Sequence, residues 1–125
     1  ITAQGETALE PNLLQATVLE QLGNPGGAAD AVQRALWIAP RDIARHEWLA
    51  RLADQSGRFA LAVQERRAVI ALRPPNPLEA RYQLAKALQR AGDVAAARTE
   101  LLRIREEAPG FEKAQELLLD LRGGK

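Results

Sequence analysis

The stretch LEARYQLAKALQRAGDVAAARTELLRIREEAP, residues 78–109, decides the fold because it predicts two short amphipathic helices folded back on each other. Apolar residues recur at helical spacing in both halves, at Ala80, Leu84, Leu88 and Ala91 and then at Val94, Ala97, Leu101, Ile104 and Ala108. Gly92 and Asp93 break the chain between the halves, and Pro109 stops the second helix. A lone hairpin of this size cannot bury its apolar faces, so the pattern predicts further copies of it.

Landmarks of this hairpin occur three times in register along the chain. Glycines lie at positions 23, 57 and 92, with steps of 34 and 35 residues between them. The same two steps connect Ala16, Ala50 and Ala85, then Ala28, Ala62 and Ala97, then Pro40, Pro74 and Pro109. The extra residue in the second step fits the proline-rich link PPNP, residues 74–77. The sequence therefore predicts three stacked helical hairpins.

This pattern of small residues, apolar residues and a closing proline resembles the tetratricopeptide repeat (TPR) family. The resemblance covers residues 9 to about 120 and implies an all-α, right-handed α-solenoid with repeats at 9–42, 43–77 and 78–111. The third copy matches the family pattern best. The first copy departs from it at Asn12 and Gln15, and the second at His46 and Arg66.

A seventh helix is expected at 111–122 as a cap. Its Phe111, Ala114, Leu117, Leu118 and Leu121 can cover the open end of the third repeat, which would otherwise leave apolar surface in water. Residues 1–8 are expected to be a flexible lead-in, and 123–125 a tail. Outside the third hairpin, the first four helices are expected at 11–22, from about 28 to 39, at 43–56 and from 59 to about 73.

Composition narrows the classes of function. The chain has 17 basic and 16 acidic residues, a net charge of +1, which gives no argument for nucleic acid or for an anionic membrane. It has no cysteine, which excludes disulfides and thiol chemistry. No apolar run reaches the length of a membrane span, so membrane insertion is not expected. Because the chain begins at Ile1 and contains no methionine, we expect it to be a piece of a longer protein.

The inventory of reactive residues argues against an enzyme. The one histidine, His46, and the one serine, Ser56, lie on the same predicted helix, with backbones roughly 15 Å apart along its axis. They cannot form a nucleophile and base pair within one molecule. Metal-binding spacings are also missing, so we expect no catalytic residue, no metal and no cofactor. His46 is expected to be a packed or half-buried side chain. Basic residues such as Arg66 are interspersed with acidic ones, which argues against an RNA-reading stripe.

What remains is a protein or peptide binder. In the TPR family the first helices of successive repeats line a concave groove. The family's groove positions fall here on Leu13, Thr17, Glu47, Trp48, Arg51, Asp54, Glu79, Tyr82, Gln83, Lys86, Gln89 and Arg90. The best-known subfamily grips a C-terminal carboxylate with lysines, asparagines and an arginine. This chain has Leu13, Thr17, Trp48, Glu79 and Gln83 at those places, so the resemblance does not extend to that clamp.

Two aromatic residues are the candidate anchors for such a ligand. The repeat register places Trp48 and Tyr82 on neighbouring rungs of one groove, with Arg51, Lys86 and Arg90 as polar contacts. Packing of Trp48 as part of the core is an equally good interpretation. Three hypotheses for function stay open: a scaffolding or peptide-binding module, an accessory domain of a larger enzyme or of a secretion or assembly protein, and self-association through the repeat ends. We expect a monomer or weak self-association.

Overall fold

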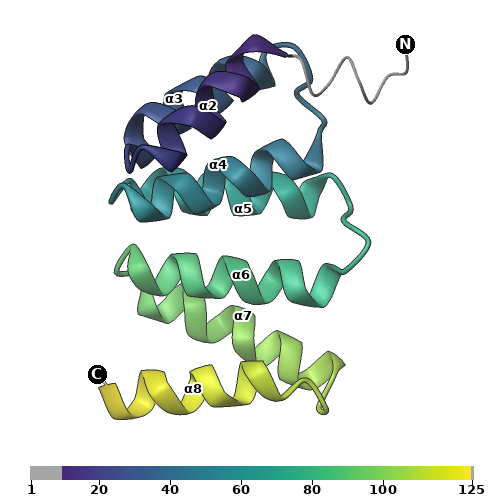
Figure 1. Ribbon diagram of the computed structural model, residues 1–125. Helices are drawn as coiled ribbons and strands as arrows, with labels where there is room; N and C mark the ends of the chain where they lie inside the picture. The colour runs from purple at the N-terminus through teal and green to yellow at the C-terminus, as the bar shows by residue number, and fades with distance from the viewer. Residues whose placement is uncertain (1–9, 125) are drawn as a thin grey trace. The chain divides into compact units, whose positions relative to one another are not determined.

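The computed structural model describes residues 10–124, and within that range the chain forms seven α-helices and no strand (Figure 1). In chain order the helices are α2 (Pro11–Gln21), α3 (Pro25–Leu36), α4 (Ile43–Gln55), α5 (Phe59–Ala71), α6 (Pro77–Arg90), α7 (Val94–Glu107) and α8 (Glu112–Gly124). The predicted all-α fold of helical hairpins followed by a capping helix is confirmed. The predicted lead-in 1–8, together with Leu9 and Lys125, lies outside the described residues.

Polar side chains determine where the helices begin. Asp42 Oδ1 accepts a hydrogen bond from the backbone N–H of Arg45 at 3.2 Å, and Asp93 Oδ1 accepts one from Ala96 at 3.1 Å. Glu10 serves α2 in the same way. These bonds satisfy N–H groups that have no partner inside the first helical turn, so the starts follow from local sequence.

The predicted bounds of the second helix, 28–39, are wrong by three residues at both ends. Asn24 Oδ1 accepts from the N–H of Gly27 at 2.9 Å and Pro25 takes the first helical position, so α3 includes both glycines that suggested a broken turn. At its end, the N–H groups of Trp37 and Ile38 bond to carbonyls three residues back. This tighter turn ends the α-helix at Leu36.

Two further helix ends differ from the prediction. The expected end of the fourth helix at residue 73 is wrong, because Arg73 has a φ of +60° and precedes Pro74, and α5 stops at Ala71. The expected tail at 123–125 is also wrong in part, because α8 continues to Gly124. A glycine in a helix costs about 1 kcal/mol. This cost does not end α8 before its two glycines, because buried leucines already hold the helix in place.

The three landmark glycines are the hairpin turns. Gly23, Gly57 and Gly92 have φ values of +78°, +80° and +91°, a region that residues with a Cβ atom rarely adopt. The step of 34 and 35 residues in the sequence is therefore the repeat of one backbone turn.

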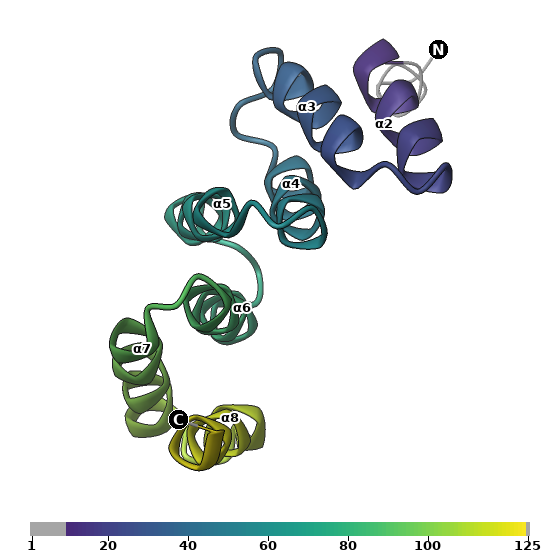
Figure 2. The same cartoon turned by 90° about the vertical axis from the view of Figure 1, so that its left-hand side faces the viewer.

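The chain divides into two compact units, residues 1–65 and 66–125, whose boundary in the sequence falls inside α5. In the first unit α3 packs against both α2 and α4 (Figure 2). Its core consists of Ala16, Ala28, Ala29, Ala31, Val32, Leu49 and Leu52, with Leu19, Leu36, Trp48 and Leu61 packed against it. Most of the core side chains are small, which lets these helices lie close together.

The second unit contains α6, α7 and α8, and α7 packs against both of the others (Figure 2). Its buried apolar residues are Ala80, Leu84, Ala85, Ala87 and Leu88 on α6, Ala97, Leu101 and Ile104 on α7, and Ala114, Leu117, Leu118 and Leu121 on α8. The buried face of α8 covers the hairpin as a cap does. The repeat bounds and the right-handed twist of the array involve both units and stay predictions.

His46 has a structural role in the first unit. Its Nε2 lies 2.7 Å from the carbonyl oxygen of Pro40, which can only accept, so this nitrogen carries a proton. Its Nδ1 lies 2.6 Å from Oε1 of Glu65, and both side chains are almost fully buried. The expectation of a half-buried, packed histidine therefore agrees with the structure. The hydrogen bond to the His46 ring offsets the cost of burying the Glu65 carboxyl group.

Replacing His46 with Phe, the kind of residue typical of the family at this position, should destabilise the chain by about 2–3 kcal/mol. The reason is that Glu65 would remain buried without its partner. The double variant His46→Phe, Glu65→Leu should recover much of that loss. Urea unfolding followed by circular dichroism measures both, and a single variant as stable as the wild type would contradict the role of the pair.

Ala85 is fully buried on α6, the helix that packs against α7. Enlarging it with Ala85→Leu should overpack the hairpin and cost about 1–3 kcal/mol of unfolding free energy. The matched control is Ala95→Leu, which adds the same atoms at an exposed position of α7. Thermal melts of both variants test the packing, and equal melting temperatures would show that the helices do not meet at Ala85.

Candidate functional site

In the first unit the predicted site residue Trp48 is held on two sides. Its ring is half-buried against the core, and its Nε1–H donates to Oε1 of Glu20 at 3.0 Å. Arg51, one turn further along α4, donates to Oε2 of the same carboxylate. The structure thus brings together Trp48 and Arg51 around an acidic residue of α2.

The electrostatics of this cluster limit what it can bind. The hydrogen bond from Arg51 lowers the pKa of Glu20 below its usual value of 4.5, the bond from Trp48 acts in the same direction, and partial burial opposes both. The Glu20 carboxylate is therefore held ionised between two donors. A carboxylate from a ligand would have to compete with Glu20 for Arg51. The polar groups at this part of the expected groove are therefore already hydrogen-bonded to one another.

In the second unit the predicted site residue Tyr82 is surrounded by aromatic and cationic groups. The ring of Phe111 meets it edge to face, with centroids 5.9 Å apart and an angle of 69° between the planes. The Nζ atoms of Lys86 and Lys113 each lie 5.6 Å from the centroid of the Tyr82 ring. Both ammonium groups are thus within the range of a cation–π interaction.

Glu79 ties this cluster together. Its Oε2 accepts from Nε2 of Gln83 at 2.8 Å and its Oε1 lies 3.1 Å from Nζ of Lys113. The hydrogen bond from Gln83 is the largest cause that lowers the pKa of Glu79 below 4.5, with Lys113 and the charge of Lys86 adding to it, while burial opposes the shift. Lys86 makes no ion pair with a described residue, although its charge acts on Glu79 and its ammonium group lies over the Tyr82 ring.

The remaining predicted site residues lie elsewhere on α2, α4 and α6. Leu13 is half-buried, and Thr17 Oγ1 donates to the Leu13 carbonyl of its own helix at 3.0 Å. Gln89 is half-buried, whereas Glu47 and Arg90 are exposed.

Sequence reasoning missed three participants: Glu20, Phe111 and Lys113. Glu20 could have been found, because it lies one repeat step before Asp54 and two before Gln89, positions already assigned to the groove. Lys113 lies 34 residues after Glu79, so the repeat could have indicated it, but the sequence assigned this region only the role of a cap. The contacts of Phe111 and Lys113 with Tyr82 become visible only in the packing of the second unit.

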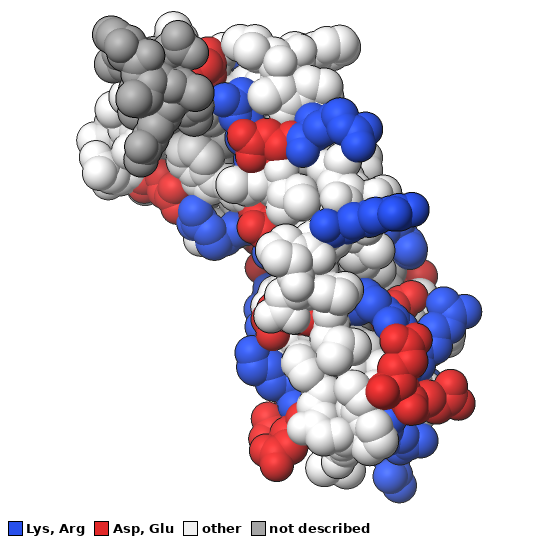
Figure 3. All heavy atoms as spheres, turned by 90° about the vertical axis from the view of Figure 1, so that its right-hand side faces the viewer, with Lys and Arg blue, Asp and Glu red and all other residues white. Residues whose placement is uncertain are grey.

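Other kinds of site find little support. Within residues 10–124 no group of three or more His, Cys, Asp or Glu side chains is arranged to hold a metal ion. None of the described helices is long and apolar enough to cross a membrane. On the face drawn in Figure 3, acidic and basic side chains are interspersed in both units instead of forming a broad field of one sign.

Lowered pKa values predict acid sensitivity. Because the folded pKa of Glu20 and of Glu79 lies below 4.5, both carboxylates stabilise the fold above that pH, and their contribution is lost as the pH falls below it. Glu79→Gln should therefore flatten the fall of the melting temperature between about pH 5 and pH 3. The control is Glu106→Gln at an exposed position. An unchanged acid limb in Glu79→Gln would contradict the interpretation.

Comparison with known proteins was made by sequence and by structure. No protein-family model and no curated protein matches the chain. Among solved structures, a mutant of the O-GlcNAc transferase of Thermobaculum terrenum matches with 25% identity and a TM-score of 0.66, over 97% of this chain and 23% of that one. The chain thus spans less than a quarter of the transferase.

Two smaller neighbours match over nearly their whole length. The N-terminal domain of stress-induced protein-1 (STI-1) from C. elegans has a TM-score of 0.74 and 16% identity, over 98% of this chain and 99% of that one. The first TPR of Spaghetti (RPAP3), solved with the HSP90 peptide SRMEEVD, has a TM-score of 0.70 and 16% identity, over 90% and 89%. At such identity these likenesses establish the fold alone.

Proposed function

We propose that this chain, which has the tetratricopeptide-repeat fold, is a non-catalytic interaction module that binds a segment of a partner protein on the half-buried face of α6 that carries Tyr82 and Lys86. The segment carries an apolar side chain and acidic character. The observation that carries the proposal is the cluster at Tyr82, where two lysine ammonium groups each lie 5.6 Å from the centroid of one aromatic ring.

The chemistry of the cluster suggests this ligand. Aromatic side chains contribute a large contact area at low entropy cost, and neighbouring cations attract and orient carboxylates. Tyr82 is braced by Phe111, so little order has to be gained on binding. Lys86 has no ion-pair partner among the described residues, in contrast to Arg51, which is bonded to Glu20. We therefore place the main anchor at Tyr82, with Trp48 as the weaker candidate.

Peptide binding by a structural neighbour supports the class of ligand but not its identity. The RPAP3 domain was solved with an HSP90 peptide. The positions that would grip a C-terminal carboxylate in the best-known TPR subfamily are occupied here by Leu13, Thr17, Trp48, Glu79 and Gln83. Glu79 is held ionised and would repel such a terminus. We therefore propose recognition of an internal acidic segment.

A second candidate is an accessory role in a larger enzyme. It is favoured by the match of 97% of this chain to a part of the O-GlcNAc transferase chain. In that case the Tyr82 cluster would recruit a substrate protein or partner to catalytic residues elsewhere. A full gene sequence that encodes a transferase domain beside these repeats would favour the second candidate.

The proposal is tested by recovering partners with the intact chain and then titrating them against folded variants. Tyr82→Ala should weaken binding by about 2 kcal/mol or more. Tyr82→Phe should retain most of it, because the ring remains. Lys86→Gln should weaken binding more at low salt than at high salt.

The control is Arg67→Glu, a charge change at an exposed position of α5, the second helix of its hairpin, and it should have little effect. Trp48→Ala should have an effect smaller than that of Tyr82→Ala. Equal binding by the wild type and by a folded Trp48→Ala, Tyr82→Ala variant would exclude both clusters. Light scattering over a concentration series would detect self-association instead.

A further inference from the structure

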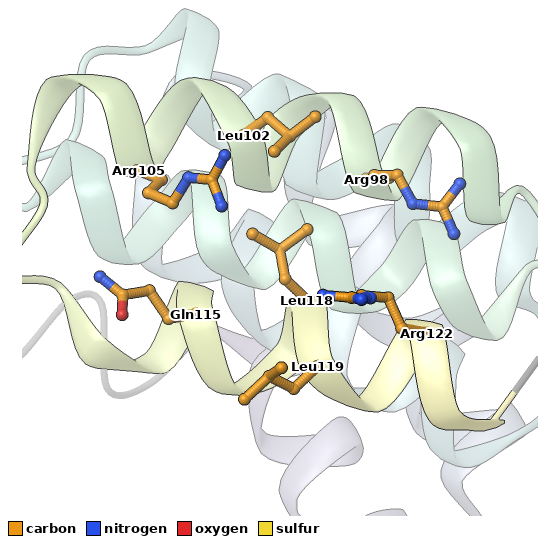
Figure 4. A pocket seen from close by; sticks show the side chains of 7 residues that line it. All are labelled: Arg98, Leu102, Arg105, Gln115, Leu118, Leu119 and Arg122. Carbon is orange, nitrogen blue, oxygen red and sulfur yellow. The ribbon is translucent and has the colours of Figure 1, made fainter.

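A second surface of the second unit is basic and apolar at once. It is a hollow of about 370 Å³ between α7 and α8, here called the α7–α8 trough. Its lining includes Arg98, Leu102 and Arg105 from α7 and Leu118, Leu119 and Arg122 from α8. The leucines lie in the middle, with Arg98 and Arg122 towards one end and Arg105 towards the other (Figure 4).

The internal repeat identifies what kind of surface this is. Five buried positions of α4, at 45, 49, 50, 52 and 53, recur 35 residues later as the buried positions 80, 84, 85, 87 and 88 of α6. On α8 the pattern recurs with a step of 34 at Ala114, Leu118 and Leu121. The two remaining positions of the pattern fall on Leu119 and Arg122, and both residues are exposed. The exposed fraction of Leu119 is 63%.

These two exposed positions lie in the trough. Their counterparts on α6 are Ala85 and Leu88, which are buried in a helix that packs against a second helix, α7. Within residues 10–124 no second helix follows α8. The trough is therefore the side of α8 on which a hairpin partner would lie, and its geometry is that of a seat for a helix.

The residues in this seat differ from those of the repeat. Ala85 is replaced by the larger Leu119, and the apolar Leu88 by the charged Arg122. A helix cannot approach Leu119 as closely as it approaches an alanine, and a buried Arg122 would need an acidic partner. The seat thus disfavours the close packing of one more ordinary repeat helix and favours a helix that carries carboxylates.

Charge gives the same indication. Arg98, Arg105 and Arg122 make no ion pair with any described residue, and no carboxylate lines the trough. The hollow among α5, α6 and α7 is different. There an Nη atom of Arg81 on α6 lies 2.7 Å from Oε1 of Glu107, and its Nε lies 3.7 Å from Oε1 of Glu100. Both glutamates belong to α7, the helix that packs against α6. The trough has the arginines of such an arrangement but no glutamate or aspartate to pair with them.

We propose that the α7–α8 trough binds an acidic amphipathic helix of a partner protein. The helix sets apolar side chains on Leu102, Leu118 and Leu119 and its carboxylates against the arginines at both ends. A second copy of this chain fits less well. The exposed apolar stripe of α2, at Leu14, Val18 and Leu22, has one carboxylate on its helix, Glu20, and that group is already bonded to Trp48 and Arg51.

The probe is a synthetic amphipathic helical peptide with leucines along one face and glutamates on both flanks, labelled for fluorescence anisotropy. A second peptide has glutamine in place of every glutamate. The intact chain should bind the acidic peptide, and the glutamine peptide should bind roughly tenfold more weakly or worse. Arg98→Gln and Arg122→Gln should each weaken the acidic peptide about fivefold. Leu119→Ser should weaken it to a similar extent.

The matched control is Arg41→Gln, which removes one exposed charge from the first unit and should leave binding unchanged. Circular dichroism verifies that each variant is folded. The proposal is overturned by equal affinity for the two peptides, by an equal loss in Arg41→Gln, or by loss in Tyr82→Ala with none in Arg98→Gln. Dimerisation that Arg98→Gln abolishes would assign the trough to a second copy. Arginine-dependent binding to anionic phosphatidylserine vesicles without binding to the peptide would assign it to a lipid surface.

Discussion

Close contact between paired helices at buried alanines is the constraint on which this structure depends. Ala16, Ala50 and Ala85 on the first helices of the hairpins, and Ala28, Ala62 and Ala97 on the second helices, are exposed by 2% or less. A side chain no larger than a methyl group lets two backbones approach, and the leucines around it then fill the space at the density of a protein interior. The left-handed glycine between the helices returns the chain within a few residues. Apolar burial can therefore be achieved with hardly any aromatic residues.

Polar contacts between neighbouring helices add to the packing at the alanines. Arg45 is buried and donates to the carbonyl oxygen of Ala35, which lies near the end of α3, and Arg81 is paired with two glutamates of α7. Both guanidinium groups are already engaged by carbonyl or carboxylate oxygens within the fold, so they have little to offer a ligand. The charges that remain are more informative. Lys86 beside the Tyr82 ring and the three arginines of the α7–α8 trough make no ion pair with a carboxylate among the described residues, and both proposals rest on that difference.

Helix α8 contributes to both proposed surfaces, although the repeat pattern assigns it only the role of a cap. Near its beginning Phe111 and Lys113 complete the surroundings of Tyr82. Further along, Leu118, Leu119 and Arg122 line the trough. One face of α8 is buried, whereas Leu119 and Arg122 on its other face are exposed. An exposed position tolerates a leucine or an arginine where α6 has a buried alanine or leucine.

The sequence by itself determined the all-α class, the turns at Gly23, Gly57 and Gly92, and the buried positions, because each depends on spacing along one chain. It also predicted Trp48 and Tyr82 as unusual, since the repeat places both on first helices. It misjudged the start of α3, where the cap of Asn24 outweighs two glycines, and the end of α8. Only the tertiary structure decided which charges are free. The bonds from Arg51 and Trp48 to Glu20, and the approach of Lys113 to Tyr82, join residues about 30 positions apart whose side-chain directions no local pattern specifies.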